Sequence, residues 1–442
     1  MKRAIATISF FLCLLLVFNL YCSAETDNEL TSSDGKYGYY SDEDGIWFSG
    51  STEPGITVLN IPEKIDGKKV TGTRRCTVNS NCVVKVNMPS SIKTVSQSFP
   101  LFSSLEQFIP LCNISFNNEI THFDTWAFSH ARADKRYEIK SQLKVVVFPE
   151  LTEKIGFSGF NISEVENIVF QKDYFTQSAS ISDNFYYEKS ESDRAYSVNV
   201  YFVDKASNFS ADTFDWLDPI DDELALYYRE ANKPYPINYH INPNVTIYKK
   251  PGAEGFEKFE EAGYTVKEYT DEWWKDIKEI QSVEISGEGV TEKKNSQAKG
   301  TVTVLGWSPS NDPAQYLSRE YELSAKPGDK IKLASSFAPS DAFDDRTFFV
   351  SLNEDIATVD TETGEVTVLK DGTATIRCVA ASGVFSDCFI YSGSAAQTQA
   401  KTQAKSDSLE AKTPLIIISC SCAAVLIAGA VIFTVKKKRR KV

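Results

Sequence analysis

The chain has 442 residues, of which 42% are hydrophobic and 24% charged, so it is long enough to bury large hydrophobic cores. Its formal net charge is −13 at pH 7. A surface this acidic repels phosphate backbones, which excludes nucleic acid as a partner.

The N-terminus has the pattern of a secretory signal peptide over residues 1–24. Lys2 and Arg3 precede an apolar run over residues 10–20, and the small residues Ser23 and Ala24 suit a peptidase that cuts after Ala24. Acylation at Cys22 is the alternative, but the bulky Tyr21 disfavours it.

An apolar pattern with a proline at a fixed offset then recurs along the chain. An apolar residue is followed by others three and five positions later, by proline at six, and by apolar residues near nine and twelve. The best copies are Val83, Val86, Met88, Pro89, Ile92 and Val95; Ile56, Leu59, Ile61, Pro62 and Ile65; and Leu143, Val146, Phe148, Pro149, Leu151 and Ile155. Weaker copies start at Leu105, Val165 and Val198. Because one such unit cannot bury its apolar face alone, the pattern predicts a solenoid of stacked units.

These residues resemble the BspA-like leucine-rich repeat proteins of bacterial surfaces, over residues 34–270. The entry unit is carried by Tyr37-Gly38-Tyr39-Tyr40 and by residues 61–72, and the terminal unit by residues 245–248 and a helix over 256–262 that ends at Gly263. The resemblance implies a leucine-rich-repeat solenoid and a role in adhesion. Between residues 171 and 243 the prolines of the pattern are absent, which leaves the repeat register there open.

A second module is predicted over residues 281–393. Short alternating strands at 331–333, 356–360, 366–368 and 374–378 are divided by Gly364 and Gly372, which is typical of a β-sandwich. The strings ATVD and GTATI resemble the bacterial immunoglobulin-like domain of group 2. Phe349 stands where that family usually has tryptophan, and residues 288–320 form an insertion with a predicted hairpin through 300–307.

Cys378 and Cys388 lie ten residues apart around Gly383. A hairpin centred on that glycine would set them directly opposite each other, so we expect a disulfide. Cys76 and Cys82 are a second, less favoured pair, because the repeat family that this region resembles commonly keeps such cysteines as small buried apolar residues.

The C-terminus predicts a membrane anchor. Residues 394–413 read as a flexible stalk, and residues 415–435 carry no charge over a length that crosses a bilayer. Residues 436–442 form a basic tail that the positive-inside tendency keeps in the cytoplasm. We therefore expect a single-pass protein of the plasma membrane with its N-terminal ectodomain outside. Without the signal peptide and the C-terminal basic cluster, which carry two and six positive charges, residues 25–412 have a net charge of −21.

Residues for catalysis or metal binding are sparse. His122, His130 and His240 show no metal-ligand spacing, and no nucleophile or phosphate-loop motif is present. Acidic clusters at 42–45, 218–223 and 341–345 lack the spacing of a calcium loop, and solvated turns are the favoured interpretation. We expect no catalytic, cofactor or metal residues, and we expect Trp273 and Trp274 to be buried between the two modules.

The predicted fold is mainly β: a leucine-rich-repeat solenoid, an immunoglobulin-like sandwich and one transmembrane helix. The predicted function is a non-catalytic, adhesin-like surface protein whose solenoid presents a binding face to an extracellular protein or polysaccharide, with the sandwich as spacer. A structural envelope scaffold without a dedicated ligand is the alternative, and a membrane-tethered hydrolase is a less favoured one.

Overall fold

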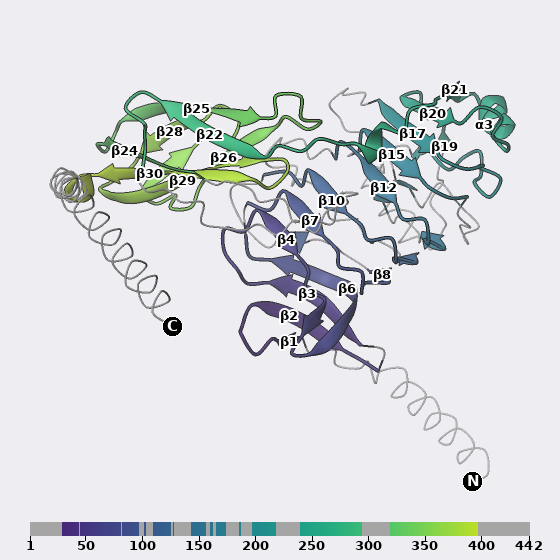
Figure 1. Cartoon of the computed structure of the whole chain (residues 1–442), viewed down its shortest axis with the longest axis horizontal. Helices are drawn as coiled ribbons and strands as arrows, with labels where there is room; N and C mark the ends of the chain where they lie inside the picture. The colour runs from purple at the N-terminus through teal and green to yellow at the C-terminus, as the bar shows by residue number, and fades with distance from the viewer. Residues whose placement is uncertain are drawn as a thin grey trace, which may run out of the picture.

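The computed structural model describes residues 29–43, 45–80, 82–96, 101–102, 109–124, 127, 143–155, 160–161, 165–173, 185–186, 197–217, 239–293 and 319–396. These residues are mainly β, as predicted (Figure 1). The predicted signal peptide, membrane span and basic tail lie outside the described residues, as does the predicted stalk beyond residue 396. In the part of the chain that the structure describes, no helix is both long enough and apolar enough to cross a bilayer.

Residues up to 268 form a parallel-stranded region. Strands pair in the orders β10-β7-β4 and β12-β15-β17-β20-β21, and every pair in these two sheets is parallel. The strands are β4 (Val58–Asn60), β7 (Lys85–Asn87), β10 (Asn113–Ser115), β12 (Val146–Phe148), β15 (Asn167–Phe170), β17 (Val198–Phe202), β20 (Val245–Lys249) and β21 (Thr265–Glu268). In each of these sheets, strands that are neighbours in space are also consecutive in the list above. Because they are parallel, the connection between two neighbours leads from the end of one strand back to the starting edge of the sheet.

A third sheet of this region has the order β1-β2-β3-β6-β8-β11-β13. It starts with antiparallel pairs and continues in parallel from β3 onward. Its strands are β1 (Leu30–Thr31), β2 (Tyr37–Ser41), β3 (Ile46–Ser51), β6 (Lys68–Val78), β8 (Thr94–Val95), β11 (His122–Phe123) and β13 (Lys154–Ile155), with β5 (Lys64–Ile65) and β9 (Leu101–Phe102) paired to β6. Two small pairs join β14 (Phe160–Asn161) to β16 (Phe185–Tyr186) and β18 (Trp216–Leu217) to β19 (Tyr239–His240).

The apolar positions of the repeated pattern form one continuous core. Leu59 pairs with Val86 and Val86 with Ile114 across the strands, and all three side chains are buried in the same cluster. Further along, Phe148 stacks on Phe170 with ring centroids 5.2 Å apart. Each unit therefore buries its apolar side chains against those of the next unit. This arrangement is expected when a single unit cannot bury its apolar face alone. Proline begins the turn after a strand, as in the hydrogen bond from Ile92 N to the Pro89 carbonyl (3.1 Å).

The strand register confirms some predicted copies and corrects others. The bridge between Leu143 and Val165 confirms the copy at Val165. The copy expected at Leu105 is wrong, because the neighbour of Val86 is Ile114, so this unit begins at Leu111. It has Asn117 in place of proline, and the Asn117 amide donates to the carbonyls of Pro89 and Ile92 in the preceding turn.

The copy expected at Val198 is displaced by one residue. Ile168 pairs with Val200, so Val165 corresponds to position 197. Because side chains alternate along a strand, a shift of one residue exchanges the buried and outward faces. At the end of the region, α3 (Glu257–Ala262) confirms the predicted helix, and Gly263 ends it with a left-handed φ of 103°.

Residues 282–392 form a two-sheet sandwich with the orders β22-β25-β28-β27 and β23-β24-β30-β29-β26. The strands are β22 (Ser282–Gly287), β23 (Thr291–Glu292), β24 (Glu320–Ala325), β25 (Lys330–Ala338), β26 (Thr347–Ser351), β27 (Ala357–Val359), β28 (Glu365–Val368), β29 (Gly372–Ala380) and β30 (Phe385–Ser392). All four predicted strands are confirmed. Phe349 is 3% exposed in the sandwich core, so phenylalanine fills the position for which tryptophan was expected. The predicted hairpin through 300–307 lies outside the described residues.

Candidate functional site at the junction of the two regions

The outward face of strands β4, β7 and β10 is covered by the chain itself. Val58, Lys85 and Asn113 occupy one cross-strand row, and alternation turns their side chains away from the core of the parallel-stranded region. The Lys85 side chain is only 1% exposed. Figure 1 shows why: the sandwich lies against these strands rather than beyond the end of the region. The sandwich therefore packs on the side of the parallel-stranded region.

An apolar cluster joins the two regions. Its members from the parallel-stranded region are Cys82, Val84, Ile109 and Cys112, and its members from the sandwich are Phe348, Val350, Val379 and Ala381. All of them are buried. Burial of apolar surface contributes roughly 25 cal/mol for each Å² removed from water, so this cluster favours the docked arrangement.

The β29–β30 hairpin inserts its tip beside β4. The Thr57 hydroxyl donates to the Gly383 carbonyl at 2.6 Å, and the Arg377 guanidinium donates to the Gly55 carbonyl. Arg377 also donates two hydrogen bonds of 2.8 Å to the two carboxylate oxygens of Asp387. This bidentate pair fixes the orientation in which the guanidinium contacts Gly55 across the junction.

The linker over residues 269–281 covers the outward face of the neighbouring strands. Trp274 is 3% exposed and lies 5.2 Å from Tyr201 between ring centroids. Trp273 is partly exposed, and it contacts Tyr201 on one side and stacks on Phe343 of the sandwich at 5.0 Å on the other. The predicted burial at the junction is confirmed for Trp274, while Trp273 connects the two regions.

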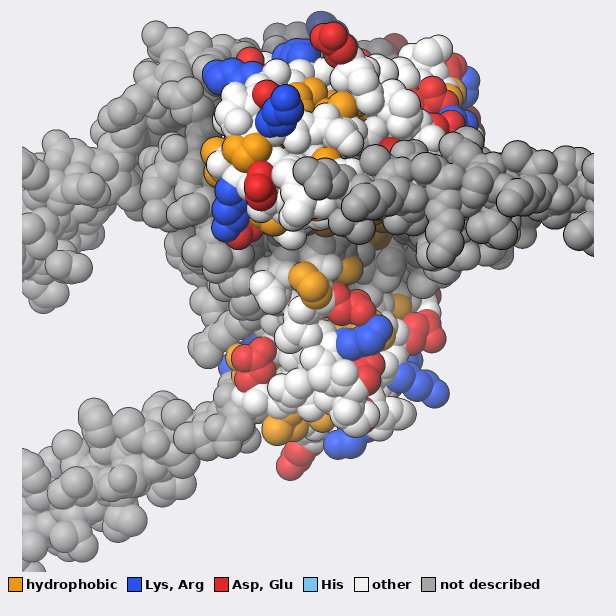
Figure 2. Space-filling model, turned by 90° about the vertical axis from the view of Figure 1, so that its left-hand side faces the viewer, with side chains coloured by type: hydrophobic (Ala, Val, Ile, Leu, Met, Phe, Trp, Pro, Cys, Tyr) orange, Lys and Arg blue, Asp and Glu red, His pale blue; other side chains and the backbone are white. Residues whose placement is uncertain are grey.

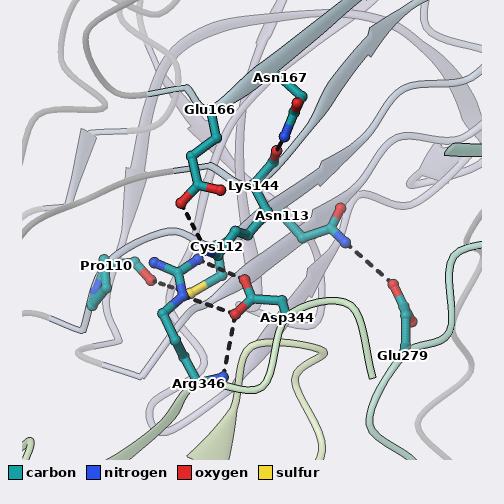
Figure 3. Close-up of polar contacts among 9 residues, drawn as sticks. All are labelled: Pro110, Cys112, Asn113, Lys144, Glu166, Asn167, Glu279, Asp344 and Arg346. Atoms are coloured by element: carbon teal, nitrogen blue, oxygen red, sulfur yellow. Dashed lines mark hydrogen bonds and ion pairs between the residues drawn. The ribbon is translucent and has the colours of Figure 1, made fainter. Parts of the chain in front are cut away.

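A buried charge pair holds the linker to the parallel strands. Lys85 Nζ lies 2.5 Å from Glu279 Oε1. The Asn113 amide donates to the same oxygen at 3.2 Å (Figure 3). Burying a lysine charge is costly unless it has a partner, so the close approach of Glu279 offsets the loss of water around Lys85.

A second pair lies on the sandwich side of the junction. Arg346 donates from Nε and Nη2 to the two carboxylate oxygens of Asp344 at 2.8 and 2.6 Å (Figure 3). Burial by itself lowers the pKa of Arg346, but the hydrogen bonds and charge of Asp344 outweigh it and raise the pKa above the ordinary value. The guanidinium therefore stays charged at every physiological pH.

Cys112 belongs to the same junction, but its thiol is unreactive. Its Sγ lies 3.2 Å from the Pro110 carbonyl, and burial raises the pKa of the thiol to about 12. The thiolate is the nucleophilic form of cysteine, so Cys112 packs and does not react at neutral pH.

A cavity at the junction is too small for an organic ligand. It is lined by residues of both regions and the linker, among them Asn113, Lys144, Glu279 and Asp344, and its volume is about 30 Å³. One or two water molecules fill such a space. The arrangement of these groups holds the two regions together.

The predicted disulfide partners do not face each other. Cys378 pairs with Ser386 and Cys388 with Ile376, because the hairpin is centred one residue earlier than expected. The geometric premise of the predicted bond is therefore wrong, and both cysteines are free thiols in the sandwich core. Cys76 and Cys82 are also free, and they lie in different apolar clusters.

The other residues considered for chemistry remain apart. His122 lies in β11, His240 in β19, and His130 falls outside the described residues. Asp341 pairs with Lys278 at 2.5 Å, and the acidic residues at 218–223 lie outside the described ranges. Among the residues described, no three His, Cys, Asp or Glu side chains gather where they would hold a metal ion.

Sequence reasoning missed the junction pairs. Lys85 stands alone between valines in the string VVKV, a signal that it needs a buried partner, but Glu279 lies 194 residues away. Asp344 was interpreted only as part of an acidic turn, and Arg346 was not singled out.

Comparison with curated proteins finds no match to this chain. Residues 318–387 match the family model of the Bacterial Ig-like domain (group 2). This match covers most of the sandwich strands and confirms the predicted resemblance of that part of the chain. Over residues 318–387 the sandwich is therefore similar to the bacterial Ig-like domains of group 2.

Proposed function

We propose that this chain is a non-catalytic, adhesin-like interaction protein of the bacterial cell surface. The Ig-like sandwich carries the proposal, because residues 318–387 match a family of bacterial Ig-like domains. In the proposal the parallel-stranded region is a leucine-rich-repeat solenoid, which the proline-marked pattern and the parallel ladders support.

The junction favours one rigid body over two modules on a flexible rod. The apolar cluster and the Trp273 contacts connect the solenoid to the sandwich, and the Lys85–Glu279 pair holds the linker to the solenoid. A rigid body loses less conformational freedom on binding, so it presents a surface at a lower entropic cost.

The surface composition also suits an exposed, soluble ectodomain. On the face seen in Figure 2, acidic and basic side chains are interspersed and apolar ones are scattered. Mixed charge of this kind opposes nonspecific association, so binding would be confined to a specific site.

The proposed topology follows from the targeting patterns: residues 1–24 direct export and residues 415–435 anchor the chain with the ectodomain outside. The test is display of the full chain on a non-adherent bacterial host, followed by binding of intact cells to immobilised matrix proteins and polysaccharides. We expect saturable binding that is lost after protease treatment of the cells. Equal binding of cells with and without the chain would contradict the proposal.

A matched control tests the anchor. A charge in the middle of the span disfavours insertion by about 3 kcal/mol, so Leu426→Arg should weaken retention of the chain in the membrane fraction, whereas Leu426→Ile should not. Equal retention of the two variants would contradict the proposed span.

A further inference from the structure

The described part of the solenoid has three main sheets, and the outward faces of two of them, β10-β7-β4 and β12-β15-β17-β20-β21, are unavailable to an external partner. The outward face of β4, β7 and β10 is covered by the sandwich, and that of β15, β17 and β20 by the linker residues around Trp274. A binding surface on this region must therefore be sought on the other sheet, which runs from β1 to β13.

That sheet carries an outward row of six residues across six strands. Tyr40 pairs with Trp47, Trp47 with Gly72, Gly72 with Thr94, Thr94 with His122 and His122 with Lys154. The next residue on each strand from β3 to β13 is buried in the core, which turns this row outward. Apart from Gly72, the members are partly or fully exposed. Five strand spacings of about 4.8 Å give the row a length of roughly 24 Å.

One end of the row is an aromatic platform. A side chain at Gly72 would put a Cβ 2.5 Å from Cζ3 and 2.6 Å from Cε3 of Trp47, so the indole lies against the bare backbone of the glycine. The indole Nε1 donates to Asp42 Oδ2 at 2.5 Å, which fixes the rotation of the ring. Tyr40 stands beside it, with the Arg74 guanidinium 5.5 Å from the centre of its ring. A partly exposed tryptophan is thus held in one orientation.

The charges around the row are balanced. Arg74 and Lys154 are offset by Asp42 and Asp124, on a chain whose net charge is −13. A highly charged partner finds no complementary potential here, whereas a neutral one is not repelled. Thr94 and His122, farther along the row, supply hydrogen-bonding groups, although His122 Nδ1 already contacts Thr121 Oγ1 at 2.8 Å.

We propose that the row Tyr40–Trp47–Gly72–Thr94–His122–Lys154 is a binding surface for a neutral polysaccharide, whose pyranose rings stack on Trp47 and Tyr40 and whose hydroxyl groups bond to the polar members. This inference rests on the proposed surface function and specifies its ligand class. The pairing of flat apolar rings with hydrogen-bonding neighbours suits a sugar, which has an apolar ring face and a polar edge.

The experiment measures binding of the full chain, purified in a detergent without a sugar headgroup, to soluble oligosaccharides of glucan, mannan, galactan and chitin, with a heparin fragment as the anionic comparator. Saturation-transfer NMR reports which sugar protons contact the protein. We expect saturable binding to at least one neutral glycan, with contacts on the ring face, and on the order of tenfold weaker binding for Trp47→Ala and for Tyr40→Ala.

Three further variants make the result specific. Gly72→Ala should weaken binding because it displaces the indole while both rings remain. Trp47→Phe keeps an aromatic ring and should retain part of the affinity. It replaces Trp47→Ala as the test of ring stacking if Trp47→Ala does not fold. Phe389→Ala removes a partly exposed aromatic ring from strand β30 of the sandwich and should leave binding unchanged.

Binding to none of the neutral glycans would overturn the proposal, as would a preference for heparin or loss of affinity only in Phe389→Ala. If cells displaying the chain adhere to a matrix protein while Trp47→Ala and Tyr40→Ala change nothing, the glycan surface is refuted and the adhesin function stands. If displayed cells adhere to nothing, the proposed function itself fails.

Discussion

Gly383 at the tip of the β29–β30 hairpin lies so close to Val58 on β4 that a Cβ at residue 383 would overlap the Val58 Cγ2 methyl group. Its φ of +91° is also a conformation that residues with a Cβ rarely adopt. The glycine therefore permits both the turn and the close approach of the sandwich to the parallel strands.

This contact predicts the effect of Gly383→Ala. Gly328 has the same φ of +91° but has nothing near its Cβ position, so Gly328→Ala measures backbone strain alone. We expect Gly383→Ala to lower the free energy of unfolding by about 1–3 kcal/mol more than Gly328→Ala does. Urea denaturation measures both, and Val58→Ala should rescue part of the loss in Gly383→Ala. Equal losses for the two alanine variants would show that the hairpin tip does not bear on Val58.

The Lys85–Glu279 pair predicts an asymmetry between its two members. The Lys85 side chain is 1% exposed and the Glu279 side chain 26%. Glu279→Gln leaves a charged lysine in the interior and should cost about 3 kcal/mol. Lys85→Met leaves a glutamate that still reaches water and should cost less. Chemical denaturation of the two single variants and the double variant gives the coupling energy of the pair. A larger loss of stability in Lys85→Met than in Glu279→Gln would contradict the predicted order.

Trp274 and Trp273 are adjacent in sequence but should respond differently to truncation. Trp274 is 3% exposed against Val169, Tyr201 and Tyr269, so Trp274→Ala should cost about 3–5 kcal/mol. Trp273 is partly exposed, and Trp273→Ala should cost less while loosening the contact with Phe343. Hydrogen exchange of the linker should rise in both variants, and a smaller stability loss in Trp274→Ala would contradict the packing.

The buried cysteines predict a loss of stability in alkali. Burial raises the pKa of Cys82 to about 11 and that of Cys112, Cys378 and Cys388 to about 12, from an ordinary value of 9.0. Since unfolding exposes thiols that ionise near pH 9, their stabilising contribution is complete below pH 9 and is lost as the pH rises from 9 to 12. The melting temperature should fall through this range, and Cys112→Ala should make the fall less steep.

Thiol counting gives a second measurement of the same cysteines. In the native protein, a maleimide at pH 7 should leave Cys76, Cys82, Cys112, Cys378 and Cys388 unmodified, and all five should react after denaturation without reductant. A mass consistent with a Cys378–Cys388 bond would restore the disulfide that the strand register argues against.

Much of the secondary structure followed from local pattern. The proline that follows each apolar pattern at a fixed distance identified the units at Ile56, Val83 and Leu143. A strand that buries alternate side chains needs apolar residues at alternate positions, and a proline after them ends the strand, so the same pattern recurs in each unit. The sandwich strands that Gly364 and Gly372 separate were likewise predicted from their alternating side chains and from the turns between them. The pattern failed at Leu111, where Asn117 performs the role of proline through its side-chain amide.

The sequence by itself determined which residues alternate between core and surface, since that depends on neighbours a few positions away. Only the tertiary structure decided what covers the outward faces. Lys85 meets Glu279, Gly383 meets Val58, and Tyr40, Trp47 and Gly72 share one row, because sheets bring together residues that are remote in sequence. Contacts of that kind depend on the packing of whole strands and sheets, so they cannot be predicted from the local pattern of apolar and polar residues.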